Sequence, residues 1–114
     1  MILPNAHLAI VEERKVTGYL LNASHPDNGG KAQFFQTMGY SALEWALLVA
    51  ALRQVAVLGR VVSQVHGRHG TKSIVDGQLP SQLGAGKDRA VPTVWIVELG
   101  DDLPRLVTVY PRTS

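Results

Sequence analysis

His25 and Lys31 are two residues whose types and spacing could do chemistry together. His25 precedes Pro26 in a turn-rich stretch, and histidine titrates near neutrality, which makes it the commonest general acid or base. Lys31 follows Gly29-Gly30 at the start of an expected helix, where backbone N–H groups and an ammonium charge can hold an anion. The pair predicts proton transfer beside a bound anion. An exposed loop histidine and a solvated helix-end lysine are the structural alternatives.

The last quarter of the chain sets hydroxyl, aromatic and basic side chains within two β-rich runs. Residues 91–99 and 105–110 flank a Gly-Asp-Asp turn, which predicts an antiparallel hairpin. A purely structural hairpin does not need so many such residues close together, although each one alone also suits a strand or a core. We expect these residues to contribute to a site: Thr93, Trp95, Arg105, Thr108 and Tyr110.

The register of this hairpin decides whether those side chains share a face. If Asp101-Asp102 is a two-residue turn, Trp95 lies opposite Thr108 and the hydroxyl and aromatic side chains point to one side, since side chains alternate along a strand. A three-residue turn instead places Ile96 opposite Thr108, and Trp95 and Thr108 then point to opposite faces. We predict the first register and keep the second as its alternative.

Several kinds of site are excluded because the residues they need are absent or dispersed. The chain has no cysteine, so disulfides, thiolate catalysis and cysteine-based zinc sites are excluded. His66 and His69 have no Asp or Glu close by in sequence that would complete a metal site. The nine acidic residues form no magnesium cluster, and their one adjacent pair, Asp101-Asp102, suits the hairpin turn. We therefore predict neither a metal nor a cofactor.

Composition places the chain among folded globular proteins. Its 114 residues suit one domain, with 46% hydrophobic and 18% charged residues. A net charge of +2 and a pI near 9.2 permit a basic face that meets phosphates. Charged and amide residues interrupt the apolar region 42–58, and the N-terminus lacks the pattern of a signal peptide. We expect a cytoplasmic protein without a membrane partner.

Helical patterns occupy the first half of the chain. Apolar spacing predicts one helix over about 12–22 and a short one over 31–38, joined by a turn-rich loop. Ser41 and Glu44 form a capping-box pattern that opens a longer helix over about 42–57. The expected buried stripe of this helix consists of Leu43, Leu47, Ala50, Ala51 and Val55.

Strand patterns occupy the second half. Residues 60–72 are expected to form an irregular or short edge segment, followed by a strand over about 73–79, a Gly-rich loop and the hairpin. This order predicts an α+β fold, with N-terminal helices packed on one face of a three- to four-stranded antiparallel sheet. One domain would span 1–114, with its helical half at about 12–58 and its sheet at about 73–110.

Short motifs spread over nearly the whole chain carry a resemblance to known proteins. They are Lys15-Val-Thr-Gly-Tyr-Leu-Leu-Asn22, His25-Pro26, Lys31-Ala32 with Phe35, Val94-Trp95-Ile96 and Pro104-Arg-Leu-Val-Thr-Val-Tyr-Pro111. Through them the chain resembles an uncharacterised family of small bacterial domains, found alone and at the C-termini of toxin-like proteins. Their order is also similar to that of the barnase/EndoU/colicin/RelE-like ribonuclease toxins. In those toxins one or two helices precede a four-stranded antiparallel sheet, whose concave face carries the catalytic groups. The chain departs from that pattern because it has neither a barnase-like Glu-Arg-His set nor a clear second histidine of the EndoU kind.

The resemblance implies a small metal-independent endoribonuclease, the toxin of a toxin–antitoxin or related conflict system. The RNA 2′-OH would attack the neighbouring phosphorus and leave a cyclic phosphate, which requires proton transfer and positive charge but no metal. We assign proton transfer to His25, charge stabilisation to Lys31 and a hydrogen bond to phosphate to Thr108. The predicted substrate contacts are Lys15, Arg105, Thr93, Trp95 and Tyr110, with the aromatic residues stacking on a base. RNA and a cognate antitoxin or immunity protein are the expected partners.

A non-enzymatic partner-binding protein, the antitoxin or immunity side of such a pair, is the alternative. In that interpretation the apolar helix 42–57 docks a partner. A third interpretation, a subunit without a site of its own, fits if the second hairpin register forms. The sequence leaves a homodimer open.

Overall fold

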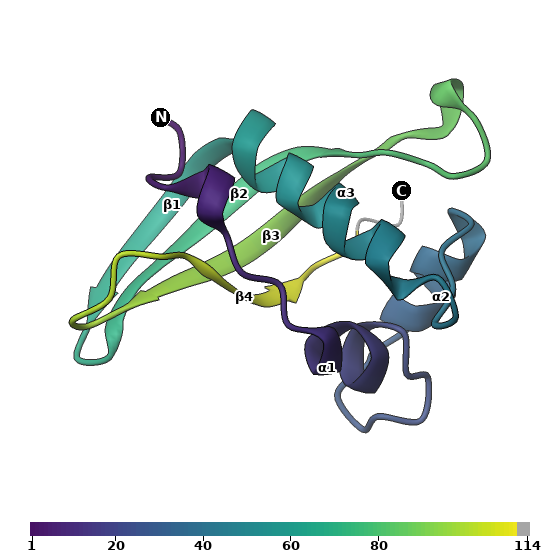
Figure 1. The fold of residues 1–114 in the computed structure, drawn as a ribbon, viewed down its shortest axis with the longest axis horizontal. Helices are drawn as coiled ribbons and strands as arrows, with labels where there is room; N and C mark the ends of the chain where they lie inside the picture. The colour runs from purple at the N-terminus through teal and green to yellow at the C-terminus, as the bar shows by residue number, and fades with distance from the viewer. Residues whose placement is uncertain (112–114) are drawn as a thin grey trace.

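The computed structural model describes residues 1–111, which form helices on one side and a four-stranded sheet on the other (Figure 1). The helices are α1 (Glu13–Lys15), which continues into the π-helical turn η2 (Val16–Leu20), then α2 (Lys31–Thr37) and α3 (Trp45–Leu58). The strands are β1 (Arg60–Gly67), β2 (Gly70–Leu79), β3 (Arg89–Glu98) and β4 (Arg105–Val109). Short 3₁₀ turns lie at Ala6–Leu8 (η1) and Ala85–Lys87 (η3). The predicted α+β fold is confirmed.

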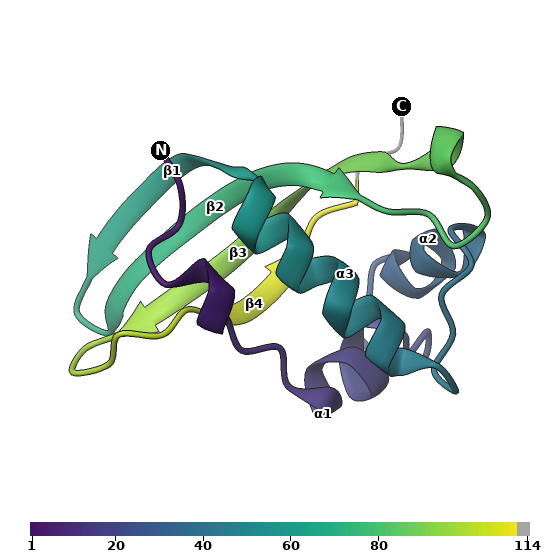
Figure 2. The ribbon, with the colours of Figure 1, turned by 45° about the horizontal axis from the view of Figure 1, so that its top comes forward.

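The sheet has the order β1-β2-β3-β4, and all three pairs of neighbours are antiparallel. Each strand therefore follows its neighbour through a hairpin-type connection, the simplest antiparallel topology. Helix α3 crosses one face of the sheet, α1 lies on the β4 side, and α2 lies at the end of the sheet near the connection between β2 and β3 (Figure 2). In the part of the chain that is described, no helix has the length and apolarity needed to cross a bilayer.

Strand β1 and the start of β2 correct the expected irregular segment at 60–72. The strand was missed because its side chains lie mostly exposed and a bulge between Val61 and Ser63 breaks the period-two pattern. A strand exposed on both faces has no alternation of apolar and polar residues for a sequence pattern to detect. The sheet consequently begins at Arg60 rather than near residue 73.

Helix α3 begins and ends close to its expected limits but buries a different stripe. Its core-facing residues are Leu48, Ala51, Leu52, Val55 and Ala56. Two members of the predicted stripe, Leu43 and Leu47, are 92% and 42% exposed, and Ala50 is exposed as well. The helix is apolar on most sides, so its spacing alone permits more than one stripe. The prediction of the stripe was wrong at these three positions.

A glycine in β2 lets α3 approach the sheet closely. A Cβ added at Gly77 would lie 2.9 Å from Val55 Cγ1 and 3.2 Å from the Cα of Gly59. The absence of a side chain at this point selects Val55 and its neighbours as the contact stripe. Ser41, expected as the helix cap, instead accepts a hydrogen bond from the Glu44 N–H (3.3 Å) in the turn before the helix.

The β3–β4 hairpin adopts neither of the two expected registers. Thr108 pairs with Val94, and Trp95 pairs with Leu106 across a bulge. Paired residues of an antiparallel ladder share a face and neighbours along a strand alternate. Trp95 and Thr108 therefore point to opposite faces, and the predicted common face of Thr93, Trp95, Thr108 and Tyr110 does not form.

Trp95 and Thr93 belong to the hydrophobic core. Both are 0% exposed. The Trp95 indole N–H donates to Thr93 Oγ1 (2.7 Å), and the Thr93 hydroxyl donates to the Val75 carbonyl (2.9 Å). Buried polar groups need such partners, and these bonds satisfy the indole within the core.

The N-terminal segment brings the first helix to the edge of β4. Ile10 and Arg105 form a parallel bridge, in which the Ile10 N–H donates to Pro104 O and the Leu106 N–H to Ile10 O. This bridge covers part of the β4 edge and places Glu12 and α1 beside Arg105. The N-terminal segment and β4 thus lie side by side.

A buried asparagine connects η2, the following loop and α2. The Asn28 side chain is 3% exposed, and its amide N–H₂ donates to the carbonyls of Tyr19 (2.7 Å) and Leu20 (3.3 Å). Its Oδ1 accepts from the Ala32 N–H (3.0 Å), one of the free N–H groups in the first turn of α2. One side chain therefore holds the elements that carry Tyr19, His25 and Lys31.

Replacing Asn28 by alanine should destabilise the protein by about 1–3 kcal/mol, since it leaves buried backbone groups without partners. The measured midpoint of thermal unfolding should fall by roughly 4–8 °C for each kcal/mol lost. Asn22→Ala is the matched control, because the Asn22 side chain makes its bonds at the exposed surface. Equal losses in the two variants would show that Asn28 has no special structural role.

Tyr40 links the end of α2 to the end of β2, and its hydroxyl donates to the Pro80 carbonyl. Burial raises the pKa of this phenol above its usual value of 10.0. Because the folded pKa exceeds the unfolded one, the contribution of the neutral phenol is complete below about pH 10 and is lost as pH rises through the folded pKa.

The stability advantage of the wild type over Tyr40→Phe should therefore be constant between about pH 7 and 9 and shrink above about pH 10. Denaturant unfolding of both proteins at several pH values measures this difference. A gap that stays constant to about pH 11 would contradict a buried, neutral Tyr40 phenol.

Candidate functional site

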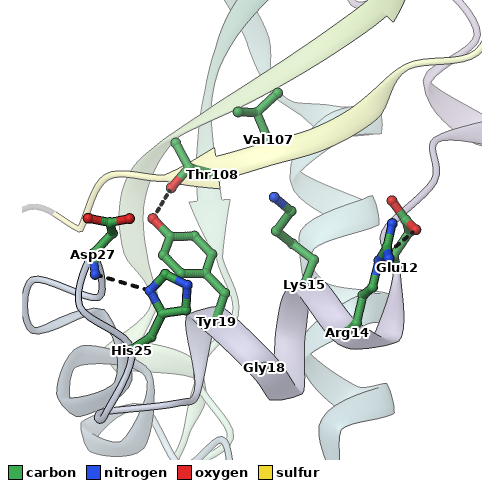
Figure 3. A pocket seen from close by; sticks show the side chains of 9 residues that line it. All are labelled: Glu12, Arg14, Lys15, Gly18, Tyr19, His25, Asp27, Val107 and Thr108. Carbon is green, nitrogen blue, oxygen red and sulfur yellow. Dashed lines mark hydrogen bonds and ion pairs between the residues drawn. The ribbon is translucent and has the colours of Figure 1, made fainter.

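An open cleft of about 630 Å³ lies between the first helical segment, the loop that follows it and strand β4 (Figure 3). Its lining residues come from chain positions almost a hundred residues apart. They are Glu12, Arg14, Lys15, Gly18, Tyr19, His25, Asp27, Val107 and Thr108. Most of these side chains are polar or charged, as expected for a site that binds an ionic ligand.

Tyr19 lies at the centre of this arrangement. Its hydroxyl and the Thr108 hydroxyl are 3.0 Å apart and hydrogen-bonded, which links η2 to β4. The Tyr19 ring meets the His25 ring edge-on, with centroids 4.9 Å apart and planes at 66°. Figure 3 shows the three side chains directed toward one another at one end of the cleft. Two hydroxyls and an imidazole, all able to donate and accept hydrogen bonds, therefore share one place.

Two lysines surround the Tyr19 ring with positive charge. The Nζ atoms of Lys15 and Lys31 lie 5.5 Å and 5.7 Å from the ring centroid, within the range of cation–π contacts. Lys31 Nζ is also 5.7 Å from the centroid of the Tyr110 ring. Neither ammonium group forms an ion pair among residues 1–111. Both charges thus remain available for an anion.

The orientation of the His25 ring follows from its hydrogen bond to the loop. Nδ1 accepts from the Asp27 N–H at 3.0 Å, and a backbone N–H can only donate. In the neutral imidazole the proton then resides on Nε2, which is left to interact with a ligand. His25 is half-buried and lines the cleft.

Glu12 connects two arginines at the other end of the cleft. Its carboxylate lies 3.1 Å from Arg105 and 3.4 Å from Arg14. The Arg105 side chain is 36% exposed, so its guanidinium stands at the rim with part of its charge compensated. Asp27 adds a second carboxylate to the lining. The two lysines without an ion pair thus lie at the Tyr19 end of the cleft, which also holds the Asp27 carboxylate (Figure 3).

Most of the site residues predicted from the sequence lie together, and two do not. Lys15, His25 and Thr108 line the cleft. Lys31 contacts both Tyr19 and Tyr110, and Arg105 joins the rim through Glu12. Thr93 and Trp95 lie in the core, where no substrate can reach them, and we do not retain them in the candidate site.

Tyr19 is the principal residue that sequence reasoning missed. Tyr19 lies within the predicted helix over about 12–22, and no role in a site was assigned to its hydroxyl. The available signal was its spacing from Lys15, because residues four apart lie on the same face of a helix. Glu12 and Arg14 were not predicted as site residues either.

Comparison with known proteins adds a fold likeness and a family. The fold is similar to that of a chain in the contact-dependent growth inhibition toxin–immunity protein complex from Klebsiella pneumoniae 342, with a TM-score of 0.75 and 15% sequence identity. The match covers 96% of this chain and 98% of that chain, and at this identity it establishes the fold alone. No curated protein matches the sequence. The profile of a domain of unknown function (DUF6883) matches residues 2–113, and the chain therefore belongs to that family.

Proposed function

We propose that this protein is the toxin of a bacterial toxin–immunity system and acts as a metal-independent endoribonuclease. The observation that carries the proposal is the convergence of His25, Lys15, Lys31 and Thr108 around the Tyr19 side chain, with His25, Lys15 and Thr108 lining one open cleft. The likeness to a chain of a toxin–immunity complex supports the biological setting. A cognate immunity protein is the partner that this setting implies.

The proposed reaction is an internal transesterification of RNA. The 2′-oxygen bonds to phosphorus as the P–O5′ bond breaks, giving a 2′,3′-cyclic phosphate and a 5′-hydroxyl. One proton leaves the 2′-hydroxyl and one reaches the departing O5′, so the reaction needs no other reagent. Lys15 and Lys31 stabilise the added negative charge on the phosphorane. The Tyr19–Thr108 pair offers one hydroxyl proton to its oxygens, because the other proton is used in the bond between the two hydroxyls.

His25 is assigned the proton transfer, through Nε2. An imidazole that gives or takes a proton at Nε2 must carry a proton on Nδ1 during that step. Nδ1 now accepts from the Asp27 N–H, so that bond has to break first. Asp27 is exposed in a loop, and the assignment therefore requires a rotation of the ring or of the loop that releases this bond.

His25→Ala should lower the rate of RNA cleavage by about 10²–10⁴-fold, the usual contribution of general acid–base catalysis. The midpoint of thermal unfolding should change little, because the His25 side chain is only half-buried. Cleavage of total RNA by the purified protein, in the presence of a chelator, measures the effect. His66→Ala is the control, since that histidine is exposed on β1 and bonds only to Thr71. Wild-type cleavage by His25→Ala would refute this assignment.

Tyr19→Phe removes the hydroxyl but keeps the ring that contacts His25 and the two lysines. The free energy of unfolding should fall by about 1 kcal/mol, because the hydrogen bond to Thr108 is lost. Single-turnover cleavage should slow by at least roughly tenfold, as for the loss of one oxyanion donor. Thr17→Val tests the same loss of a hydroxyl outside this cleft and the second cleft described below, because the Thr17 hydroxyl donates to Glu13 O. If Tyr19→Phe cleaves as fast as Thr17→Val, the Tyr19 hydroxyl has no part in the reaction.

The second candidate function is a non-enzymatic partner-binding protein. Apolar residues along and before α3 favour it, because Leu43, Leu47, Val57 and Leu58 are 92%, 42%, 43% and 75% exposed. Such residues can form the centre of a protein interface. RNA that stays intact on incubation with the purified wild-type protein would favour this candidate over the ribonuclease.

A further inference from the structure

A second cleft is lined in part by Gly30 and Pro111, which are the neighbours in sequence of Lys31 and Tyr110. It has a volume of about 460 Å³ and is lined by Gly29, Gly30, Gln33, Phe34, Thr37, Arg89 and Pro111. Lys31 follows Gly30 directly and its Nζ reaches the rings of Tyr19 and Tyr110. Tyr110 in turn precedes Pro111. Lys31 and Tyr110 therefore stand between the two clefts and connect them.

The walls of this cleft combine an apolar surface with free polar groups. Phe34 is 8% exposed and Pro111 is half-buried, so both present packed apolar atoms. Gln33 is exposed and offers a carboxamide that can donate and accept hydrogen bonds. Arg89 is exposed and forms no ion pair with any residue from 1 to 111. The Thr37 hydroxyl is already used, since it donates to Phe34 O (2.6 Å).

The two glycines keep the side of this cleft next to Lys31 open. Gly29 and Gly30 have φ angles of 61° and 89°, in the left-handed region that favours glycine. A Cβ at Gly30 would meet no atom within 4 Å. A ligand can therefore approach the backbone here and still extend toward Lys31.

We propose that this second cleft binds the nucleobase of the nucleotide adjacent to the scissile phosphate and so determines sequence preference. The inference rests on the proposed ribonuclease function. A polymer whose phosphate lies at Lys31 places its next nucleotide beside Gly30, at the entrance of this cleft. The apolar wall suits the face of a planar base, Gln33 suits its hydrogen-bonding edge, and Arg89 suits the following phosphate.

Sequencing of cleavage sites in a randomised RNA tests the proposal. Gln33→Ala should reduce the wild-type preference at one flanking position by about tenfold, the scale of a lost side-chain pairing with a base. Arg89→Ala should weaken binding of all sequences and lower the slope of log affinity against log salt by about 0.7–1. Gln36→Ala is the control, because Gln36 is exposed on the same helix and lines none of the clefts described above.

If the wild type cuts RNA but both variants match Gln36→Ala in preference and salt slope, the subsite is refuted while the ribonuclease function stands. If the wild type cuts no RNA, the proposed function fails, and titration with the four nucleoside 5′-monophosphates decides the subsite separately. Backbone amide NMR shifts at Gln33, Thr37 and Arg89 that saturate, with one base preferred, would support it. Unchanged shifts at these residues would overturn it.

Discussion

The buried carboxamide of Asn28 is the interaction on which the candidate site depends. Its N–H₂ group donates to two backbone carbonyls at the end of η2, and its oxygen accepts from a backbone N–H in the first turn of α2. The side chain therefore supplies hydrogen bonds that the backbones of these short elements cannot make for themselves. α1 has only three helical residues and α2 only seven, lengths at which an isolated helix is not stable in water. Tertiary contacts must therefore supply the order, and Asn28 supplies it at the point where Tyr19, His25 and Lys31 are carried.

The cleft combines features that separate elements could not provide. β4 contributes Thr108, η2 contributes Tyr19 and the loop contributes His25, while Lys31 at the start of α2 contacts the Tyr19 ring. The pairing of Ile10 with Arg105 then brings the N-terminal segment to β4, so that Glu12 and Lys15 close the remaining side. The ammonium groups of Lys15 and Lys31 lie over the Tyr19 ring without an ion pair among the described residues, while the two arginines pair with Glu12. An anion that contacts the Tyr19–Thr108 pair would therefore meet these two lysines.

Prediction from the sequence agreed with the structure where residues close together in the chain determine a feature, and failed where tertiary contacts determine it. The α+β class, helix α3 and strands β3 and β4 were predicted, because apolar spacing and turn residues act over a few positions. The buried face of α3 was not, since Leu48 and Leu52 rather than Leu43 and Leu47 are buried and Val55 meets the sheet where Gly77 leaves room. Strand β1 was missed because exposure of both faces removes the alternation on which strand prediction relies.

By itself the sequence determined the fold class and the chemical groups available to a site, including His25, Lys31, Lys15 and Thr108. Residue type and local spacing are sufficient for both. Only the tertiary structure decided which of these groups meet. A bulge in β4 placed Thr108 on the face away from Trp95, and the Thr93–Trp95 hydrogen bond kept both residues in the core. Tyr19 became the centre of the cleft because η2 packs beside β4, a contact between residues 89 positions apart that no local pattern encodes.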